Sequence, residues 1–423
     1  MVRRCRGITD GQLQCLQKAR RLEASHGLAT VQGDNNTLHI LTLQPLAWLV
    51  DWPLLAGAAA RLLATTDQGA QLELAGPERQ RWRWPAHIRP QSLPGSSGAG
   101  LAGLAASGDW LAVPTGDGQV LVQSATTGVT QWRGGWPTGV VKSAAWSADG
   151  QWLAVANPLA GGASIYRSSD LLDAPQVLPA TASPTQVQAT GIGAGAVLRR
   201  VAWWHKGGQT MVLGAGMASG LHAWQWPGGS PVPTSMAGVS DWADLSVSQP
   251  GDRAAAIELQ SAAVYSLEVV GDSAQARVVT TRLHQQPHLA AVAVRHGDGG
   301  VALAAGSQWS VLQAGTAVPV IGPTSAARIL DLQWSPDDRW LAVALVDGST
   351  EVWRWPEATL ALQLKGHTQR VAAVQWSADN RVLWSAGWDG TVRTWGVAAA
   401  LETAQTPDLP AKRWHLPLAE ALR

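Results

Sequence analysis

The side chains that could carry out chemistry are scattered along the chain. None of the ten His residues forms an H-x-x-x-H pair on a predicted helix, the spacing that puts two metal ligands on one helical face. His284 and His288 are four residues apart, but Pro287 between them disfavours a helix. Cys5 and Cys15 have neither the CxxC nor the Cys/His spacing of a zinc site, and two Cys are no disulfide framework. The sequence therefore predicts no metal site and no cofactor.

Glycine-rich and hydroxyl-bearing segments give no catalytic motif either. The segments that begin at Gly191 and Gly214 lack the Lys-Ser/Thr pair and the following helix of a phosphate-binding loop. No G-x-S-x-G nucleophile elbow is present. We therefore expect no catalytic residues and no enzymatic activity, although a site assembled from distant loops would leave no motif in the sequence.

The composition is typical of a folded chain with little net charge. The 423 residues include 24 Trp, 45 Gly and no Phe; 46% are hydrophobic and 14% are charged. A formal net charge of +1 does not favour broad binding of nucleic acid or membrane surfaces. No apolar segment follows the basic Met1–Arg6, and no run approaches the roughly 18 apolar residues of a membrane helix. We expect a cytoplasmic protein that is monomeric on its own.

The stretch Gly366–Trp395 contains the clearest local pattern. A Gly-His pair opens it, two short apolar runs follow, and Asp389-Gly390 separates the second run from an alternating segment that ends in Trp395. Asp-Gly between two such runs favours a tight hairpin turn, because glycine adopts a positive φ without steric cost. The stretch therefore predicts consecutive antiparallel strands.

This stretch resembles a WD40 repeat. The Gly-His pair, Ser385, the Asp-Gly turn and the final Trp fall in the order of that family. The resemblance implies that His367, Ser385, Asp389 and Trp395 form a buried hydrogen-bonded tetrad, in which Asp389 accepts from His367 and Ser385 links His367 to the indole of Trp395. A buried carboxylate needs such partners, since leaving it unpaired is costly.

Strand–turn–strand units recur along the chain. Asp347 and Asp389 mark equivalent turns 42 residues apart, a period typical of four-stranded propeller blades, and long helical runs are absent. Three units share the motif Trp-Ser-x-Asp at the end of their first strand, from Trp146, Trp334 and Trp376. The nine units cover residues 26–43, 60–74, 109–122, 151–166, 210–224, 253–267, 300–312, 339–353 and 381–395.

These units predict an all-β fold, a single closed β-propeller of four-stranded blades. We expect eight blades, with seven to nine possible, because the first unit lacks an opening strand. Its hairpin would pair with the last blade and remove the free sheet edge. Residues 10–24 predict a helix, since Asp10 can cap it and Gly27 follows its end. The expected organisation is a helical extension over 1–25 and a WD40-like propeller over 26–423.

Outer strands are expected after the third strand of several units, at 80–84, 129–133, 361–364 and 413–416. The match to the family pattern is uneven. Val343 stands where the tetrad Ser of its unit would fall, and the unit at 253–267 lacks both the turn Asp and the final Trp.

The resemblance also implies a binding face. WD40 propellers commonly bind partners on the face that carries the turn between the second and third strands and the start of the first strand. On this chain those positions are Trp388 and Val346, each before its turn Asp, and Arg370 and Arg328, each before its first strand. Exposed Trp and Arg are enriched at binding hot spots. We therefore expect a non-enzymatic scaffold or adaptor for other proteins; the alternative is a propeller enzyme or small-molecule binder that uses the central channel.

Overall fold

The computed structural model describes residues 100–398 and 401 with short gaps, and it describes β1–β8 and β16 by their backbone alone. The gaps are residues 136–140, 142, 157–161, 173–189, 193–196, 207, 217–219, 236–240, 249–250 and 272–274. The regular secondary structure of the described residues is almost entirely strands, apart from the short helix α2 (Ser168–Leu172) and the helical residues 398 and 401. The predicted all-β fold is confirmed.

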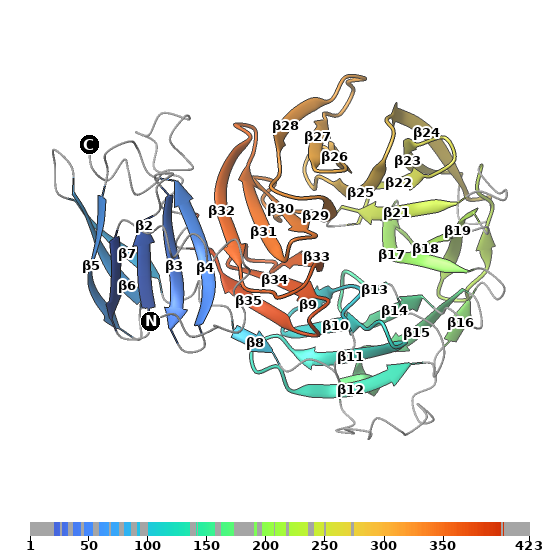
Figure 1. Ribbon diagram of the computed structural model, residues 1–423. Helices are drawn as coiled ribbons and strands as arrows, with labels where there is room; N and C mark the ends of the chain where they lie inside the picture. Colours follow the sequence, from blue (N-terminus) through green and yellow to red (C-terminus); the bar gives the residue numbers. More distant parts are fainter. Residues whose placement is uncertain are drawn as a thin grey trace.

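Seven four-stranded antiparallel blades surround a common centre, and the first strand of each blade is innermost (Figure 1). The first blade consists of β9 (Ala105–Ser107), β10 (Trp110–Pro114), β11 (Gln119–Ser124) and β12 (Thr130–Gly135). The second consists of β13 (Ala144–Trp146), β14 (Trp152–Ala156), β15 (Ala163–Arg167) and β16 (Thr190–Ile192). The third consists of β17 (Leu198–Lys206), β18 (Gln209–Gly216), β19 (Gly220–Trp226) and β20 (Pro231–Val232).

The remaining blades follow in chain order. The fourth consists of β21 (Trp242–Val247), β22 (Ala254–Glu258), β23 (Ala263–Val270) and β24 (Arg277–Gln285). The fifth consists of β25 (Leu289–Val294), β26 (Val301–Ala305), β27 (Gln308–Leu312) and β28 (Val320–Thr324). The sixth consists of β29 (Ile329–Trp334), β30 (Trp340–Leu345), β31 (Ser349–Arg354) and β32 (Thr359–Lys365). The seventh consists of β33 (Val371–Trp376), β34 (Val382–Gly387), β35 (Val392–Gly396) and β8 (Gln91–Leu93).

The outer strand of the seventh blade comes from the N-terminal side of the ring. β8 pairs with β35 through Leu93 and Val392, and the chain then enters the first blade. The first and seventh blades also share an apolar cluster, in which Leu111 and Leu121 pack with Trp384 and Ala386. The strand beside β35 is therefore β8 and neither the N-terminal hairpin nor residues 413–416, which lie outside the described residues.

The two N-terminal units lie outside the seven blades, so the expectation of eight full blades in one closed ring is not confirmed. One unit is the meander β1 (Arg21–Ser25), β2 (Leu28–Gln32), β3 (Thr37–Leu43) and β4 (Leu46–Pro53), and β4 pairs with β32 of the sixth blade. The other is a three-stranded sheet of β5 (Ala59–Thr66), β6 (Gly69–Ala75) and β7 (Gln80–Pro85). The helix expected over 10–24 is wrong for 21–24, which belong to β1, and residues 10–20 lie outside the described residues.

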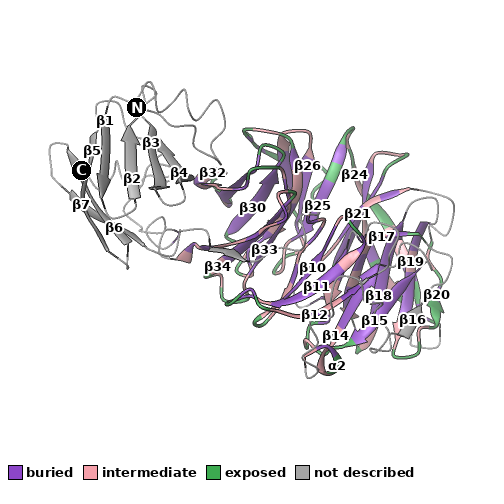
Figure 2. Cartoon of the chain, turned by 60° about the horizontal axis from the view of Figure 1, so that its bottom comes forward, coloured by how far each residue is buried: buried purple, intermediate pink, exposed green. Residues whose placement is uncertain are grey.

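Second strands of the blades are buried on both faces, because each is packed between two neighbouring blades. Their sequences are accordingly continuous apolar runs, such as WLAVAL in β30, in which every residue is buried. In Figure 2 the blade strands are largely buried, and exposed residues gather in turns and on outer strands. Indole groups join the blades: Trp334 Nε1 donates to Ala293 O and Trp376 Nε1 donates to Gln333 O, across 3.2 and 3.3 Å.

The repeated Trp-Ser-x-Asp motif has a structural function in the turn between the first two strands. In the seventh blade the Ser377 hydroxyl donates to Asp379 Oδ1 at 2.6 Å and accepts the Val382 N–H at 2.8 Å. The sixth blade repeats this arrangement at Ser335, which donates to Asp337 and accepts the Trp340 N–H. The hydrogen bonds of each motif thus fix the turn that joins the first strand to the second. Among the described residues, no helix is long and apolar enough to cross a membrane.

Candidate functional site

The structure brings His367, Ser385, Asp389 and Trp395 together in one hydrogen-bonded chain. His367 Nδ1 lies 3.0 Å from Asp389 Oδ2, and His367 Nε2 lies 2.7 Å from Ser385 Oγ. The Trp395 indole donates to the same Ser385 oxygen at 2.9 Å. His367, Ser385 and Trp395 are buried, and their side-chain polar atoms find hydrogen-bond partners within the tetrad.

Hydrogen bonds keep the Asp389 carboxylate ionised. Burial alone would raise its pKa, but donation from His367 and from Thr391 Oγ1 and the Thr368 N–H lowers the pKa below the ordinary value for Asp. For His367 the effect of burial is the opposite, because burial disfavours the protonated imidazole: it lowers the pKa of His367, although Asp389 opposes that shift. The pair is thus a neutral imidazole beside an ionised carboxylate, and it fixes the loop before β33 to the turn after β34.

Gly387 leaves the space in which this arrangement forms. A Cβ atom at that position would lie 2.3 Å from His367 Nδ1 and 2.6 Å from Asp389 Oδ1, well inside contact distance. The residue type is therefore set by the tetrad beside it. Sequence reasoning did not identify Gly387, because the approach of two side chains to one backbone position leaves no motif.

The sixth blade lacks the tetrad and uses a different acceptor for its terminal Trp. Trp353 Nε1 donates to Glu351 Oε2 at 3.0 Å, and the other carboxylate oxygen accepts the Ala326 N–H at 3.1 Å. Glu351 is buried, and burial raises its pKa. One Glu on the third strand thus replaces the Ser–His pair, which explains how this blade tolerates Val343 in place of Ser.

The four residues expected to bind a partner lie on the loop face, the face with the turns between second and third strands. They form two equivalent pairs in adjacent blades. The Val346 N–H donates to Arg328 O at 3.0 Å, and the Trp388 N–H donates to Arg370 O at 2.9 Å. Each backbone bond ties the residue before a turn Asp to the residue before a first strand, as the sequence positions imply.

Arg370 and Trp388 also contact each other through their side chains. The Arg370 guanidinium carbon lies 3.4 Å from the centroid of the Trp388 ring, which is a close cation–π stack. On another side the ring contacts Gly100, where a Cβ atom would lie 3.0 Å from Trp388 Cδ2. Trp388 is nevertheless 41% exposed. These contacts orient the indole without burying it.

The two pairs belong to one continuous surface. A Cβ atom at Gly348, in the turn after Val346, would lie 2.8 Å from His367 O and 2.9 Å from Gln369 O, so this turn touches the segment that leads to Arg370. Val346 is 37% exposed, and Arg328, Thr368 and Gln369 are also exposed. We call the surface made by Arg328, Val346, Thr368, Gln369, Arg370 and Trp388 the loop-face patch.

The inner strands bring together a second set of charged residues that the sequence did not reveal. Arg200 Nε lies 2.7 Å from Asp244 Oδ1, and Asp244 Oδ2 accepts the Val292 N–H of the next blade at 2.9 Å. Asp331 accepts the Val374 N–H of the seventh blade at 3.0 Å. Burial raises the pKa of Asp331 to about 7, against the opposing effect of Arg200.

These carboxylates join inner strands. Each accepts a backbone N–H from the following blade, and Gln333 does the same for Trp376 at 2.9 Å. Within the described residues, no group of three or more His, Cys, Asp or Glu side chains could hold a metal ion. Asp244, Asp331 and Gln333 therefore help to hold neighbouring blades together.

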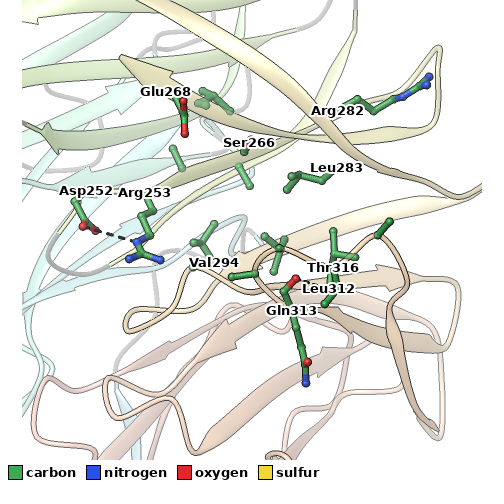
Figure 3. A pocket seen from close by; sticks show the side chains of 18 of the residues that line it. Asp252, Arg253, Ser266, Glu268, Arg282, Leu283, Val294, Leu312, Gln313 and Thr316 are labelled. Carbon is green, nitrogen blue, oxygen red and sulfur yellow. Dashed lines mark hydrogen bonds and ion pairs between the residues drawn. The ribbon is translucent and has the colours of Figure 1, made fainter. Parts of the chain in front are cut away.

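Two hollows open among the described blades, away from the loop-face patch. The larger, about 740 Å³, lies between the fourth and fifth blades and has apolar side chains in its lining, among them Leu283, Val294 and Leu312 (Figure 3). Among its charged side chains, Asp252 and Arg253 form an ion pair on one side, and Arg282 lies apart from them on another. The smaller, about 440 Å³, is lined by indole rings, including Trp146 and Trp376.

The comparisons with known proteins identify repeats at the C-terminal end of the ring. The family model "WD domain, G-beta repeat" matches residues 317–354 and 358–396. These two segments span β28–β31 and β32–β35, and thus include the tetrad and the loop-face patch. No curated protein matches the chain. Residues 317–396 thus contain two WD40 repeats, and the propeller arrangement of the blades supports the WD40-repeat β-propeller family for the chain.

Proposed function

We propose that this chain is a non-enzymatic scaffold that binds another protein through the loop-face patch. WD40 propellers generally mediate interactions between proteins, which supports the general function. The observation that carries the specific site is the exposed Trp388 ring held under Arg370. An indole fixed by its neighbours loses little conformational freedom on binding, and Trp and Arg are the residue types that dominate binding energy at interfaces.

The tetrad supports this proposal from below the surface. It ties Asp389, beside Trp388, to the loop that contains Thr368 and Arg370. The patch is thus presented by loops that have few alternative conformations. Sites of this kind need rigid support, because a loosely held side chain has to be ordered during binding.

The test begins with a partner identified by affinity purification of the full chain and then purified separately. Its dissociation constant is measured for the wild type, for Trp388→Ala, and for the double variant Trp388→Ala with Arg370→Gln. Arg282→Gln, an exposed Arg on β24, is the matched control. We expect Trp388→Ala to weaken binding by roughly 30-fold or more, the effect of a hot-spot residue. Equal affinity for all four proteins would contradict the proposal.

A further inference from the structure

We infer that the loop-face patch recognises an acidic segment of its partner, with carboxylates at Arg370 and Arg328 and an apolar side chain against Trp388 and Val346. This inference rests on the proposed function and adds the chemistry of the partner. It follows from the charges in the patch, the orientation of one guanidinium and the hydrogen bonds that the neighbouring carboxylates already accept.

Both guanidinium groups of the patch lack a carboxylate partner among the described residues. Arg328 is exposed, and the Arg370 guanidinium lies over the face of the Trp388 ring. Arg side chains remain protonated at any physiological pH. The patch therefore presents two cations to a partner.

The acids in the same loops are already engaged. The Asp389 side chain is 7% exposed, and its carboxylate accepts hydrogen bonds from His367, Thr368 and Thr391. Asp347 Oδ1 accepts the Ser349 N–H at 2.9 Å and the Ser349 hydroxyl at 2.7 Å. These bonds direct Asp389 and one oxygen of Asp347 into their own turns, and neither acid forms an ion pair with Arg328 or Arg370 among the described residues, so we infer that the partner supplies the carboxylates.

The stack on Trp388 prepares Arg370 for such a carboxylate. A guanidinium that lies on an aromatic ring still directs its N–H groups outward in its own plane, where they match the two oxygens of a carboxylate. Because the ring already restricts the side chain, less conformational entropy is lost when the pair forms. A Lys at this position would keep the charge and lose the two-pronged geometry.

The apolar part of the patch selects a second feature of the partner. Val346 and Trp388 occupy equivalent places in adjacent blades and are 37% and 41% exposed. They lie beside the two Arg residues, so acidic and apolar side chains have to alternate within a short segment of the partner. Trp388 offers area to the apolar side chain, and the Arg pair provides the selectivity.

The test is a display selection of random linear peptides on the immobilised full chain. Parallel selections use Arg370→Gln with Arg328→Gln, Trp388→Ala, and the control Arg282→Gln. We expect peptides enriched in Asp or Glu beside an apolar residue from the wild type and from the control, and loss of that enrichment from the two patch variants. Single-stranded DNA at equal concentration should not displace these peptides; displacement would assign the Arg pair to phosphate and overturn the inference.

A selected peptide is then synthesised with its acids intact and with Glu→Gln and Asp→Asn replacements. Fluorescence anisotropy should show roughly tenfold weaker binding for the amide peptide. Arg370→Lys should weaken the binding of the acidic peptide several-fold, although the positive charge is kept. Equal binding of the acidic and amide peptides would overturn the inference.

The selection separates this inference from the proposed function. The wild type could instead select neutral or basic peptides that Trp388→Ala does not bind. That result would support the patch as the binding face and would contradict an acidic partner. Peptides that bind all four proteins equally, or an absence of any enriched peptide, would count against both.

Discussion

The Arg370 guanidinium carbon lies 3.4 Å from the centroid of the Trp388 ring, and the carbonyl of the same Arg accepts the Trp388 N–H at 2.9 Å. One residue thus holds the other by its backbone and covers it with its side chain. The Trp ring is fixed while 41% of the residue stays exposed. An exposed aromatic group that is held in place is a feature expected of a binding surface.

The tetrad predicts that Asp389→Ala destabilises the protein more than Asp347→Ala does. Asp389 accepts from His367, Thr368 and Thr391, whereas the hydrogen bonds found for Asp347 come from Ser349 within its own turn. Removing Asp389 leaves buried donors unsatisfied, so we expect a cost of about 1–3 kcal/mol, against less than about 1 kcal/mol for Asp347. Urea unfolding of both variants measures the difference. Equal midpoints for the wild type and Asp389→Ala would show that the tetrad does not contribute.

Gly387→Ala should disrupt the same tetrad. The added Cβ atom would lie 2.3 Å from His367 Nδ1, so the imidazole would have to move away from Asp389. We expect a loss of about 1–3 kcal/mol in the free energy of unfolding. In the double variant with Asp389→Ala, the two losses should not add, because both remove the same interaction. Additive losses would mean that Gly387 acts elsewhere.

Glu351 predicts a graded loss of stability, because both of its carboxylate oxygens accept hydrogen bonds. Glu351→Ala would leave the Trp353 indole and the Ala326 N–H without an acceptor, at a cost of about 1–3 kcal/mol. Glu351→Gln keeps one acceptor oxygen for these two donors and turns its NH2 group toward the other donor, so we expect a loss that is smaller than that of Glu351→Ala. Thermal unfolding of the two variants side by side tests this order. A larger loss for Gln than for Ala would contradict it.

Asp331 predicts a specific pH dependence. Its pKa is raised to about 7 in the folded protein from an ordinary value of 3.8, so the folded state binds more protons than the unfolded state between these values. Stability from this group is therefore fully present below about pH 4 and is lost as the pH rises through 7. The unfolding free energy of the wild type, compared with that of Asp331→Asn, should fall from pH 5 to pH 8 by a few kcal/mol at most. A constant difference between the two proteins would contradict the shift.

The tetrad could be predicted from the sequence, whereas the segment that supplies the outer strand of the seventh blade could not. The repeat containing His367 and Trp395 has all its positions within one stretch, so local spacing identifies them. β8 shows the opposite case. Three residues, Gln91–Leu93, complete the seventh blade from a position nearly 300 residues before their partner strand. An outer strand needs only a few backbone hydrogen bonds to one neighbour, so any short extended segment can fill the place, and the pattern of side chains does not specify which one does.

Contacts between blades were equally inaccessible from the sequence. Arg200 and Asp331 belong to different repeats and act on each other only because the ring brings the inner strands together. Gly100 contacts Trp388 for a similar reason, across the junction between the seventh and first blades. Equivalent positions in neighbouring repeats, such as Arg328 and Arg370, were predictable, because the period itself places them side by side.

The most direct measurement is cross-linking from position 388 to the partner. A photoreactive aromatic amino acid replaces Trp388 in the full chain, so that position 388 keeps an aromatic ring, and the control places it at Val318, which is 78% exposed on the fifth blade. The purified partner is added to both proteins, and the cross-linked products are quantified. We predict a cross-link from position 388 that excess unmodified wild-type chain suppresses, and little or none from position 318. A cross-link from 318 with none from 388 would contradict the assignment of the loop-face patch as the binding surface.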